Sequence, residues 1–471
     1  MTEIRYELAV AAINRAMTLI DNNIHDNLDK KSEFLQQTIL ADESLTEDEK
    51  LVSIDFIIKN FDKHKIQNNK GTKRICEDCQ NECLATSYCE CCIRNYLKSN
   101  FSNWTSGNDD IDNLIQNCQL ETLKPSRILE WIPYNKFQNV NYLTKGGCSE
   151  IFIADWIEGR YNEWDLKEKQ LKRVGKRQVI LKGLENIEKA NRNWFDEAKS
   201  HITISNKWDN VVGCFGITQN PSNDNYMLVV QLMDTDLEKY LQQNNQELTW
   251  KKRIQIVQHI IYALSRIHGE NAIHRDLHSG NILFLHLNQS FYISDLGFCG
   301  PANVPINGTY GKLPYIAPEA IVGNKTTFES DIYSIGILMW EISSGQSPFA
   351  NISHDINLAM NIVNGMRPKI IPGTPLEYKI LMEQCWDADP AKRPDINSLY
   401  DKISEIKNSY NQEHHETFSH ANVTNFSYTK SISKVHMYDN LPEPRNATEE
   451  EQEVYDSTQY DFIIPDDISD D

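Results

Sequence analysis

Long apolar runs are missing from this 471-residue chain. No stretch reaches the roughly 18 consecutive apolar residues that suggest a membrane-spanning helix. The first residues carry Glu3 and Glu7 among their apolar side chains, unlike a secretory signal peptide. We therefore expect a cytoplasmic protein without a membrane span, whose 11 cysteines are reduced thiols or metal ligands and not a disulfide framework.

Basic residues are scarce as well, with 47 Lys and Arg against 67 Asp and Glu and a net charge of -20. Nucleic acid is not an expected partner, because binding a phosphate backbone needs a basic face. After Arg445 no Lys or Arg follows, whereas carboxylates are frequent. We expect residues 411–471 to form an acidic disordered tail, since the carboxylates repel one another and the segment includes few apolar residues.

Two glycines are absent from a stretch that otherwise looks like a phosphate-binding loop. Residues 143–152 read LTKGGCSEIF, with Thr144 and Ser149 where G-x-G-x-x-G-x-V would place its outer glycines. Gly146 and Gly147 remain at the tip, where backbone amides can face a phosphate. A damaged glycine motif is weak evidence alone, so its meaning depends on the rest of the chain.

The amino-terminal region is predicted to be helical. Residues 1–65 show two helical patterns, and Thr46 to Glu49 has the form of a capping box. Such helices could dock protein partners, or they could simply pack on a neighbouring domain.

A cysteine-rich segment follows at residues 70–100. Two C-x2-C pairs are separated by nine residues and offer four thiolates for a structural zinc ion: Cys76, Cys79, Cys89 and Cys92. Cys83 and Cys91 are spare thiols. The alternative is a set of reduced cysteines in a helical linker.

Beyond a linker at residues 101–136, short β-branched runs extend to about residue 233 and long helical patterns continue to about residue 407. This order predicts an α+β protein with a small strand-rich lobe followed by a large helical lobe.

The helical lobe contains AIHRDLHSGNILF and, further on, YISDLGF. These motifs place Asp276, Asn281 and Asp295 on loops. A hydroxyl that attacks a phosphoryl group needs a carboxylate to orient it and accept its proton, and Asp276 fits that need. Asn281 and Asp295 offer the hard oxygen ligands that Mg²⁺ prefers.

Residues 137–407 resemble a protein kinase domain, most closely the tyrosine-kinase-like group, and the whole chain is similar to the kinase-like proteins expanded in some fungi. The resemblance implies a bilobal fold that uses ATP and Mg²⁺ and acts on protein substrates. It implies Asp276, Lys182 and Glu197 as catalytic residues. The implied ATP-binding residues are Thr144, Gly146, Gly147, Ile151, Ile180, Lys182 and Val230.

The resemblance also implies structural contacts. Glu319 of the APE motif should pair with Arg393, and Asp331 should brace the catalytic loop. Such contacts support folding of the lobe and do not by themselves indicate activity.

Several departures from the family pattern leave two functions open, an active protein kinase and a pseudokinase that senses nucleotide or serves as a scaffold. Ile180 stands where alanine is typical and could crowd the adenine base. His278 stands where serine/threonine kinases carry a lysine, and Lys312 is a candidate for the missing cation. The sequence GKLPYIAPE favours serine or threonine over tyrosine as the acceptor.

Overall fold

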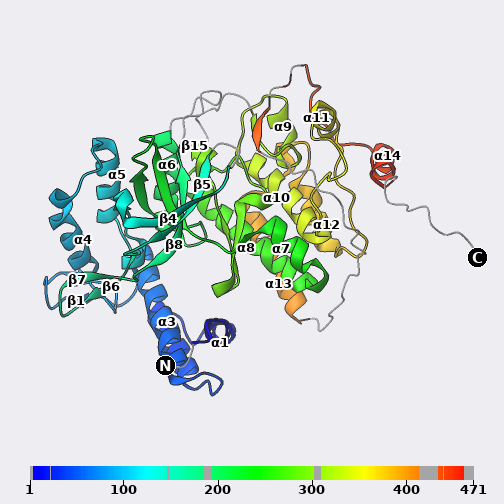
Figure 1. Cartoon of the computed structure of the whole chain (residues 1–471). Coiled ribbons are helices and arrows are strands. Elements are labelled where there is room, and N and C mark those ends of the chain that lie inside the picture. Colours follow the sequence, from blue (N-terminus) through cyan, green and yellow to red (C-terminus); the bar gives the residue numbers. More distant parts are fainter. Residues whose placement is uncertain are drawn as a thin grey trace, which may run out of the picture.

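The structure is a computed structural model that describes residues 4–21, 23–145, 149–184, 194–301, 309–412, 433–436, 438 and 440–460. Figure 1 shows a small lobe flanked by amino-terminal elements and a large helical lobe beside it.

Three helices, not the two predicted, form the amino-terminal unit: α1 (Tyr6–Thr18), α2 (Leu28–Leu40) and α3 (Glu47–Asn68). The predicted capping box at Thr46 and Glu49 is present and begins α3. The three helices share a core that includes Ile13, Leu35 and Ile57. The helix missing from the prediction is α2, a 13-residue segment that lies between the two predicted helical patterns.

The cysteine-rich segment forms a hairpin followed by a helix. Strands β1 (Arg74–Ile75) and β2 (Glu82–Cys83) are antiparallel, and α4 (Glu90–Ser99) begins directly after Cys89. Asp62 of α3 accepts hydrogen bonds from the backbone amides of Thr86 and Ser87, at 2.7 and 2.9 Å. The segment is therefore anchored to the helices before it.

The predicted linker at residues 101–136 is instead built into the small lobe. It contains η1 (Phe101–Asn103), α5 (Asp109–Leu120), η2 (Pro125–Arg127), β3 (Glu130–Trp131) and η3 (Tyr134–Lys136). Strand β3 pairs in parallel with β9 (Cys214–Gln219), and Ile111 and Ile115 of α5 belong to a small-lobe core cluster. The linker prediction was wrong: the two-residue strand β3 has too short a pattern to be recognised, and the 12-residue helix α5 was overlooked.

The small lobe is built on a six-stranded sheet with the order β3-β9-β10-β8-β5-β4. Its remaining strands are β4 (Phe137–Lys145), β5 (Glu150–Trp156), β8 (Arg177–Gly183) and β10 (Tyr226–Gln231). The predicted β-branched runs lie on these strands. Helix α6 (Trp194–Lys207) packs on the sheet, and a hairpin of β6 (Tyr161–Asp165) and β7 (Gln170–Arg173) extends towards the cysteine-rich segment.

The large lobe is mainly helical. Its helices are α7 (Leu237–Asn244), η5 (Asn245–Glu247), α8 (Trp250–Gly269), α9 (Pro318–Ile321), α10 (Phe328–Ser344), α11 (Ile356–Val363), α12 (Leu376–Cys385), η10 (Pro390–Lys392) and α13 (Ile396–Gln412). Strands β11 (Thr235–Asp236), β13 (Ile282–Leu285) and β14 (Ser290–Ile293) form a three-stranded sheet in the order β11-β13-β14, and α7 and α8 lie between β11 and β13 in the chain. The shorter elements are β12 (Ala272–Ile273), η6 (Ser279–Asn281), η7 (His286–Asn288), η8 (Leu296–Phe298), β15 (Gly300–Pro301), β16 (Thr309–Gly311) and η9 (Leu313–Tyr315). Helix α10 is buried along most of its length, which positions the loops that meet its ends.

The prediction of a disordered tail is wrong for the described residues beyond 432. Strand β17 (Lys434–His436) pairs with β16, and helix α14 (Glu449–Tyr460) packs beside the large lobe. Thr448 and Glu451 cap α14 reciprocally, and the run of glutamates lies in its first turn, where carboxylates stabilise a helix. Leu441 and Tyr455 pack against the large-lobe core. These few contacts hold the segment against the large lobe although its average composition is typical of a disordered chain.

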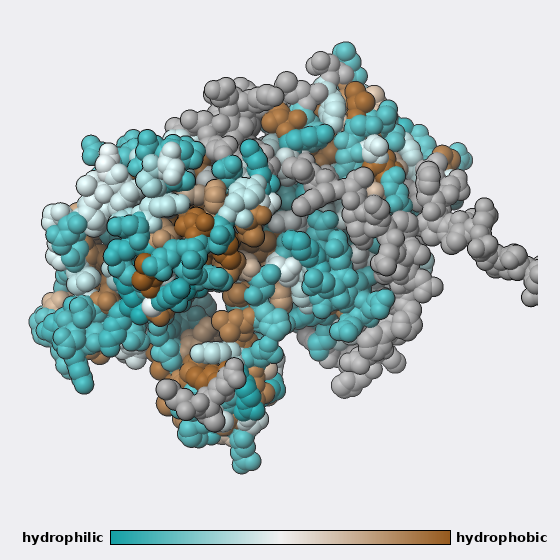
Figure 2. Space-filling model, viewed as in Figure 1, coloured by the Kyte–Doolittle hydropathy of each residue, from teal (hydrophilic) through white to brown (hydrophobic). Residues whose placement is uncertain are grey.

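Hydrophilic side chains cover most of the face shown in Figure 2, and hydrophobic ones gather over the amino-terminal helices. The exposed large apolar residues of those helices include Met17, Leu40, Leu51 and Phe56. Among the described residues, no helix is both long and apolar enough to cross a membrane.

Candidate active site and cysteine cluster

Asp331 of α10 forms hydrogen bonds that position the catalytic loop between β12 and β13. The Asp331 carboxylate accepts hydrogen bonds from the backbone amides of His274 (2.8 Å) and Arg275 (3.0 Å) and contacts His268 Nε2 at 2.9 Å. Arg275 has a φ of 69°, a conformation that costs energy for a residue with a side chain. The predicted bracing role of Asp331 is therefore present in the structure, and it holds Asp276 next to this strained residue.

Asp276 and Asn281 lie together in the loop. Asn281 Nδ2 donates to the Asp276 backbone carbonyl at 2.8 Å and lies 3.3 Å from Asp276 Oδ2. Both residues are buried. Because the amide nitrogen is engaged inward, its oxygen is the atom of Asn281 with the chemistry to ligate a hard cation.

Lys182 of β8 joins the two lobes. Its Nζ lies 2.8 Å from Glu197 Oε1 on α6 and 2.6 Å from Asp295 Oδ1 at the start of η8. Burial works against the lysine charge, but the adjacent Asp295 and Glu197 carboxylates outweigh it and raise the Lys182 pKa. Lysine therefore stays cationic, as a phosphate-binding group must.

Asp295 fits the requirements of a metal ligand. Burial alone would raise its pKa, but the charge and hydrogen bond of Lys182 lower it, so that the carboxylate is ionised at neutral pH. Its side chain is 39% exposed, whereas that of Glu197 is 5% exposed. Of the two carboxylates on Lys182, Asp295 is thus the one that faces an opening, and the residues present fit Mg²⁺ with ATP.

The predicted adenine-binding positions lie on adjacent strands. Ile180 is directly opposite Val230 on β10 and opposite Ile153 on β5, while Ile151 is opposite Lys182. Ile180 packs against a cluster that includes Val230. The sheet therefore brings these apolar side chains and the lysine to neighbouring positions, as a nucleotide site requires.

The phosphate loop is described only in part. Thr144 is at the end of β4 opposite Ile151, and Ser149 is buried. Gly146 and Gly147 lie outside the described residues.

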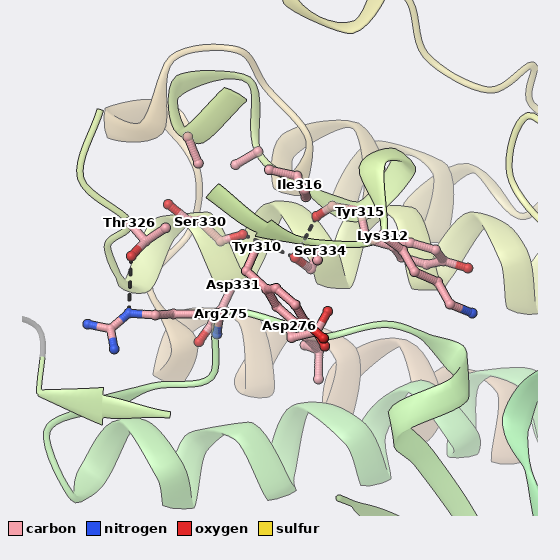
Figure 3. A pocket seen from close by; sticks show the side chains of 14 residues that line it. Arg275, Asp276, Tyr310, Lys312, Tyr315, Ile316, Thr326, Ser330, Asp331 and Ser334 are labelled. Atoms are coloured by element: carbon pink, nitrogen blue, oxygen red, sulfur yellow. Dashed lines mark hydrogen bonds between the residues drawn. The ribbon is translucent and has the colours of Figure 1, made fainter. Parts of the chain in front are cut away.

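His278 and Lys312 occupy the positions at which the sequence departs from the family. His278 is buried, and its Nδ1 accepts a hydrogen bond from the Gly280 amide at 3.0 Å. Lys312 Nζ lies 3.5 Å from Glu238 Oε2 on α7. A Cβ built on Gly280 would lie 3.5 Å from the same Lys312 Nζ. The ammonium is thus beside the catalytic loop, although Figure 3 shows it apart from the Asp276 carboxylate.

Asp276 lines a pocket together with Tyr310 and Gly311 of β16 and with the segment that follows that strand. Arg275 Nε donates to Thr326 Oγ1 at 3.1 Å, and Ser334 Oγ donates to the Tyr315 carbonyl at 2.8 Å (Figure 3). Further along, Arg393 forms the predicted pair with Glu319, with Nη2 and Oε2 2.7 Å apart. These contacts fix the segment that a substrate would meet.

The four predicted zinc ligands come together. The Sγ atoms of Cys76, Cys79, Cys89 and Cys92 all lie within 4.8 Å of one another. The Cys76–Cys92 and Cys79–Cys89 separations are 3.7 and 3.6 Å. A tetrahedral site with Zn–S bonds of about 2.3 Å has edges of about 3.8 Å, so the spacing matches zinc.

Sequence reasoning missed a charged cluster that ties the amino-terminal region to the small lobe. Asp209, just after α6, contacts Lys63 of α3 at 2.5 Å, Lys124 at 3.2 Å and Arg127 at 2.8 Å. It missed Ser433 as well, which lies at Asp276. No local motif distinguishes either residue, because their partners are far away in the sequence.

Comparison with known proteins gives a consistent result. The family described as protein tyrosine and serine/threonine kinase matches residues 137–403, more than half of the chain. The chain is 25% identical over 289 residues to the probable serine/threonine-protein kinase roco7 of Dictyostelium discoideum, covering 59% of this chain and 11% of that protein. It is 30% identical over 205 residues to the dual specificity protein kinase shkE of the same organism, covering 42% and 28%.

A human dual serine/threonine and tyrosine protein kinase is 32% identical over 186 residues, covering 39% of this chain and 20% of that protein. The chain thus spans less than a third of the length of each of these relatives.

Proposed function

This chain belongs to the protein tyrosine and serine/threonine kinase family, and from that premise we propose that it is an active, ATP-dependent protein kinase of intracellular signalling. The observation that carries the proposal is the contact of Lys182 with both Glu197 and Asp295. This contact joins the small lobe to the metal-binding loop. In a lobe arrangement without this contact, Lys182 would not be positioned to bind the ATP phosphates.

Each residue has a definite task in this proposal. Mg-ATP supplies the phosphoryl group when bound, with Asp295 and Asn281 as the residues that would hold the metal. Lys182 neutralises phosphate charge, and Glu197 orients the lysine. Asp276 orients the acceptor hydroxyl and takes its proton.

We propose serine and threonine as the preferred acceptors. The support is the GKLPYIAPE segment, whose Lys312 lies beside the catalytic loop, together with the serine/threonine and dual specificity names of the relatives.

The alternative is a pseudokinase that senses nucleotide or acts as a scaffold, and the departures at Thr144, Ser149 and Ile180 favour it. The two are separated by incubating the full chain with Mg-ATP and degenerate Ser, Thr and Tyr peptides, with mass spectrometry as the readout. The kinase proposal expects phosphoserine and phosphothreonine that depend on Asp276. If the wild-type chain incorporated no more phosphate than Asp276→Asn, the result would refute the kinase proposal and support the pseudokinase alternative.

We also propose that the cysteine cluster holds one structural zinc ion. The support is the near-tetrahedral spacing of the four sulfur atoms and the burial of Cys76 and Cys89. A short hairpin and one helix provide little core of their own, so a metal would supply much of the local folding energy.

A further inference from the structure

A serine from the carboxyl-terminal part of the chain lies at the catalytic carboxylate. Ser433 Oγ donates to Asp276 Oδ1 at 3.1 Å and lies 3.1 Å from His278 Nε2. Both contacts join residues more than 150 positions apart in the sequence. A hydroxyl hydrogen-bonded to the carboxylate that accepts its proton is in the position of a phosphate acceptor.

His278 favours the orientation in which the Ser433 hydroxyl donates its proton to Asp276. Burial lowers the pKa of His278, more than the neighbouring Asp276 carboxylate raises it, so the ring is neutral at neutral pH. Its Nδ1 accepts from the Gly280 amide, which leaves the ring proton on Nε2. Nε2–H therefore donates to Ser433 Oγ, and the hydroxyl proton is directed to Asp276.

The backbone after Ser433 is seated by strand pairing. Strand β17 is antiparallel to β16, with Lys434 opposite Gly311 and Val435 opposite Tyr310. His436 is buried, and its Nε2 lies 3.0 Å from the Gly311 carbonyl. Adding a strand to an exposed edge is a common way to bind a peptide, and here it delivers the preceding residue to the catalytic loop.

Gly311 permits this close approach. Its φ is 140°, and a Cβ built on it would lie 3.2 Å from Asp276 Oδ1. The edge that β17 joins is thus immediately beside the reacting carboxylate.

Residues further along the chain tether the segment to the same large lobe. The Arg445 amide donates to the Val363 carbonyl at 3.1 Å, and Asn446 Oδ1 accepts from the Ala388 amide at 2.8 Å. A tethered segment reaches the site at an effective concentration on the order of millimolar, well above that of a separate substrate.

We propose that Ser433 is phosphorylated in cis by the kinase domain of its own chain. This inference rests on the proposed protein kinase activity. Ser433 Oγ attacks the γ-phosphorus of ATP, the bond from that phosphorus to the β,γ-bridging oxygen breaks, and ADP leaves. The hydroxyl proton passes to Asp276 and then to solvent, so that the products are phosphoserine, ADP and a proton.

The reaction has a consequence for the segment. The new phosphate carries a charge of about -2 beside the Asp276 carboxylate, and like charges at this distance repel. The phosphorylated segment leaves the edge of β16, so that this edge and the pocket at Asp276 become accessible to other substrates.

The test follows Ser433 in the full chain with Mg-ATP by mass spectrometry. We expect phosphate at Ser433 with a first-order rate constant that is unchanged over about a hundredfold dilution, because the reaction is intramolecular. Ser433→Ala removes this phosphate. Ser457→Ala, an exposed serine of α14, is the matched control and leaves it unchanged. A rate constant that falls in proportion to protein concentration would overturn the cis reaction.

Two further measurements separate this inference from the proposed function. Phosphorylation of the degenerate peptides with Ser433 left unmodified would overturn the inference alone, whereas no transfer to either would overturn both. In ATP-free protein, hydrogen exchange should show the amides of Lys434 and His436 protected. His436→Pro removes one of these two amides and should lower both the protection of Lys434 and Ser433 phosphorylation about tenfold, with peptide phosphorylation retained. Unprotected amides in the wild-type chain would contradict the seated strand.

Discussion

Lys182 Nζ lies 2.8 Å from Glu197 Oε1, so strand β8 and helix α6 are joined at the base of the nucleotide site. The same ammonium contacts Asp295 of the large lobe. One lysine thus contacts residues of helix α6 and of the loop that carries Asp295.

Replacing Lys182 or Asp295 with alanine should lower phosphoryl transfer at least about a hundredfold, since each removes charge-assisted contacts that act on the nucleotide or its metal. Transfer is measured with radiolabelled ATP, and circular dichroism checks that the lobes remain folded. Lys239→Ala, on the exposed side of α7, serves as the control. Wild-type turnover in either variant would refute the role assigned to that residue.

Ile180→Ala should tighten ATP binding, because a smaller side chain relieves crowding that costs about 1 to 3 kcal/mol in an overpacked site. Calorimetric titration of the full chain with ATP measures the change. An increase in affinity of about tenfold corresponds to 1.4 kcal/mol. An unchanged or weaker affinity would show that Ile180 does not crowd the base.

The cysteine cluster should contain one zinc ion per chain when the protein is purified without chelator. Cys79→Ser removes one of the four ligands and should release the metal, which elemental analysis detects. Cys91→Ser changes a neighbouring thiol that is not one of the four and should retain it. A metal-free wild-type chain with a folded segment would rule out the zinc site.

Lys312→Met tests whether this lysine replaces the cation that His278 cannot supply. Loss of a charge-assisted hydrogen bond made in the transition state, worth about 1.5 to 3 kcal/mol, should slow turnover about ten- to a hundredfold. ATP affinity should hardly change. Lys325→Met alters an exposed lysine and is the control. If the Lys312 variant turned over normally, its ion pair with Glu238 would be structural only.

Glu341 gives the fold a pH dependence. Burial raises the pKa of this carboxyl to about 8, and it accepts a hydrogen bond from the Tyr315 hydroxyl at 2.7 Å. A raised folded-state pKa stabilises the fold fully below the unfolded value of about 4.3, and this stabilisation is lost as the pH rises through the folded value. Glu341→Gln cannot ionise, so its free energy of unfolding should increase relative to wild type as the pH rises through that window.

Urea unfolding at several pH values measures this difference. Glu377→Gln, at the exposed start of α12, is the control for removing one carboxylate. A constant difference between wild type and Glu341→Gln across the window would contradict the burial of an ionisable group.

Much of the site could be predicted because its residues lie in short motifs with fixed spacing. Asp276, Asn281 and Asp295 sit in two such motifs, and the four clustered cysteines lie within 17 consecutive residues. The bidentate pair of Glu319 and Arg393 was expected from the same resemblance and is present.

The sequence by itself determined the two lobes, the strand runs and the identity of the chemical groups, because periodicity and local motifs are encoded within a few neighbouring residues. Only the tertiary structure decided that residues 101–136 add a strand and a helix to the small lobe. It alone decided that Asp209 contacts three basic side chains and that Ser433 is hydrogen-bonded to Asp276. These relationships depend on pairing between distant segments. A two- or three-residue strand such as β3 or β17 has almost no pattern of its own, and it exists because a partner edge is available to it.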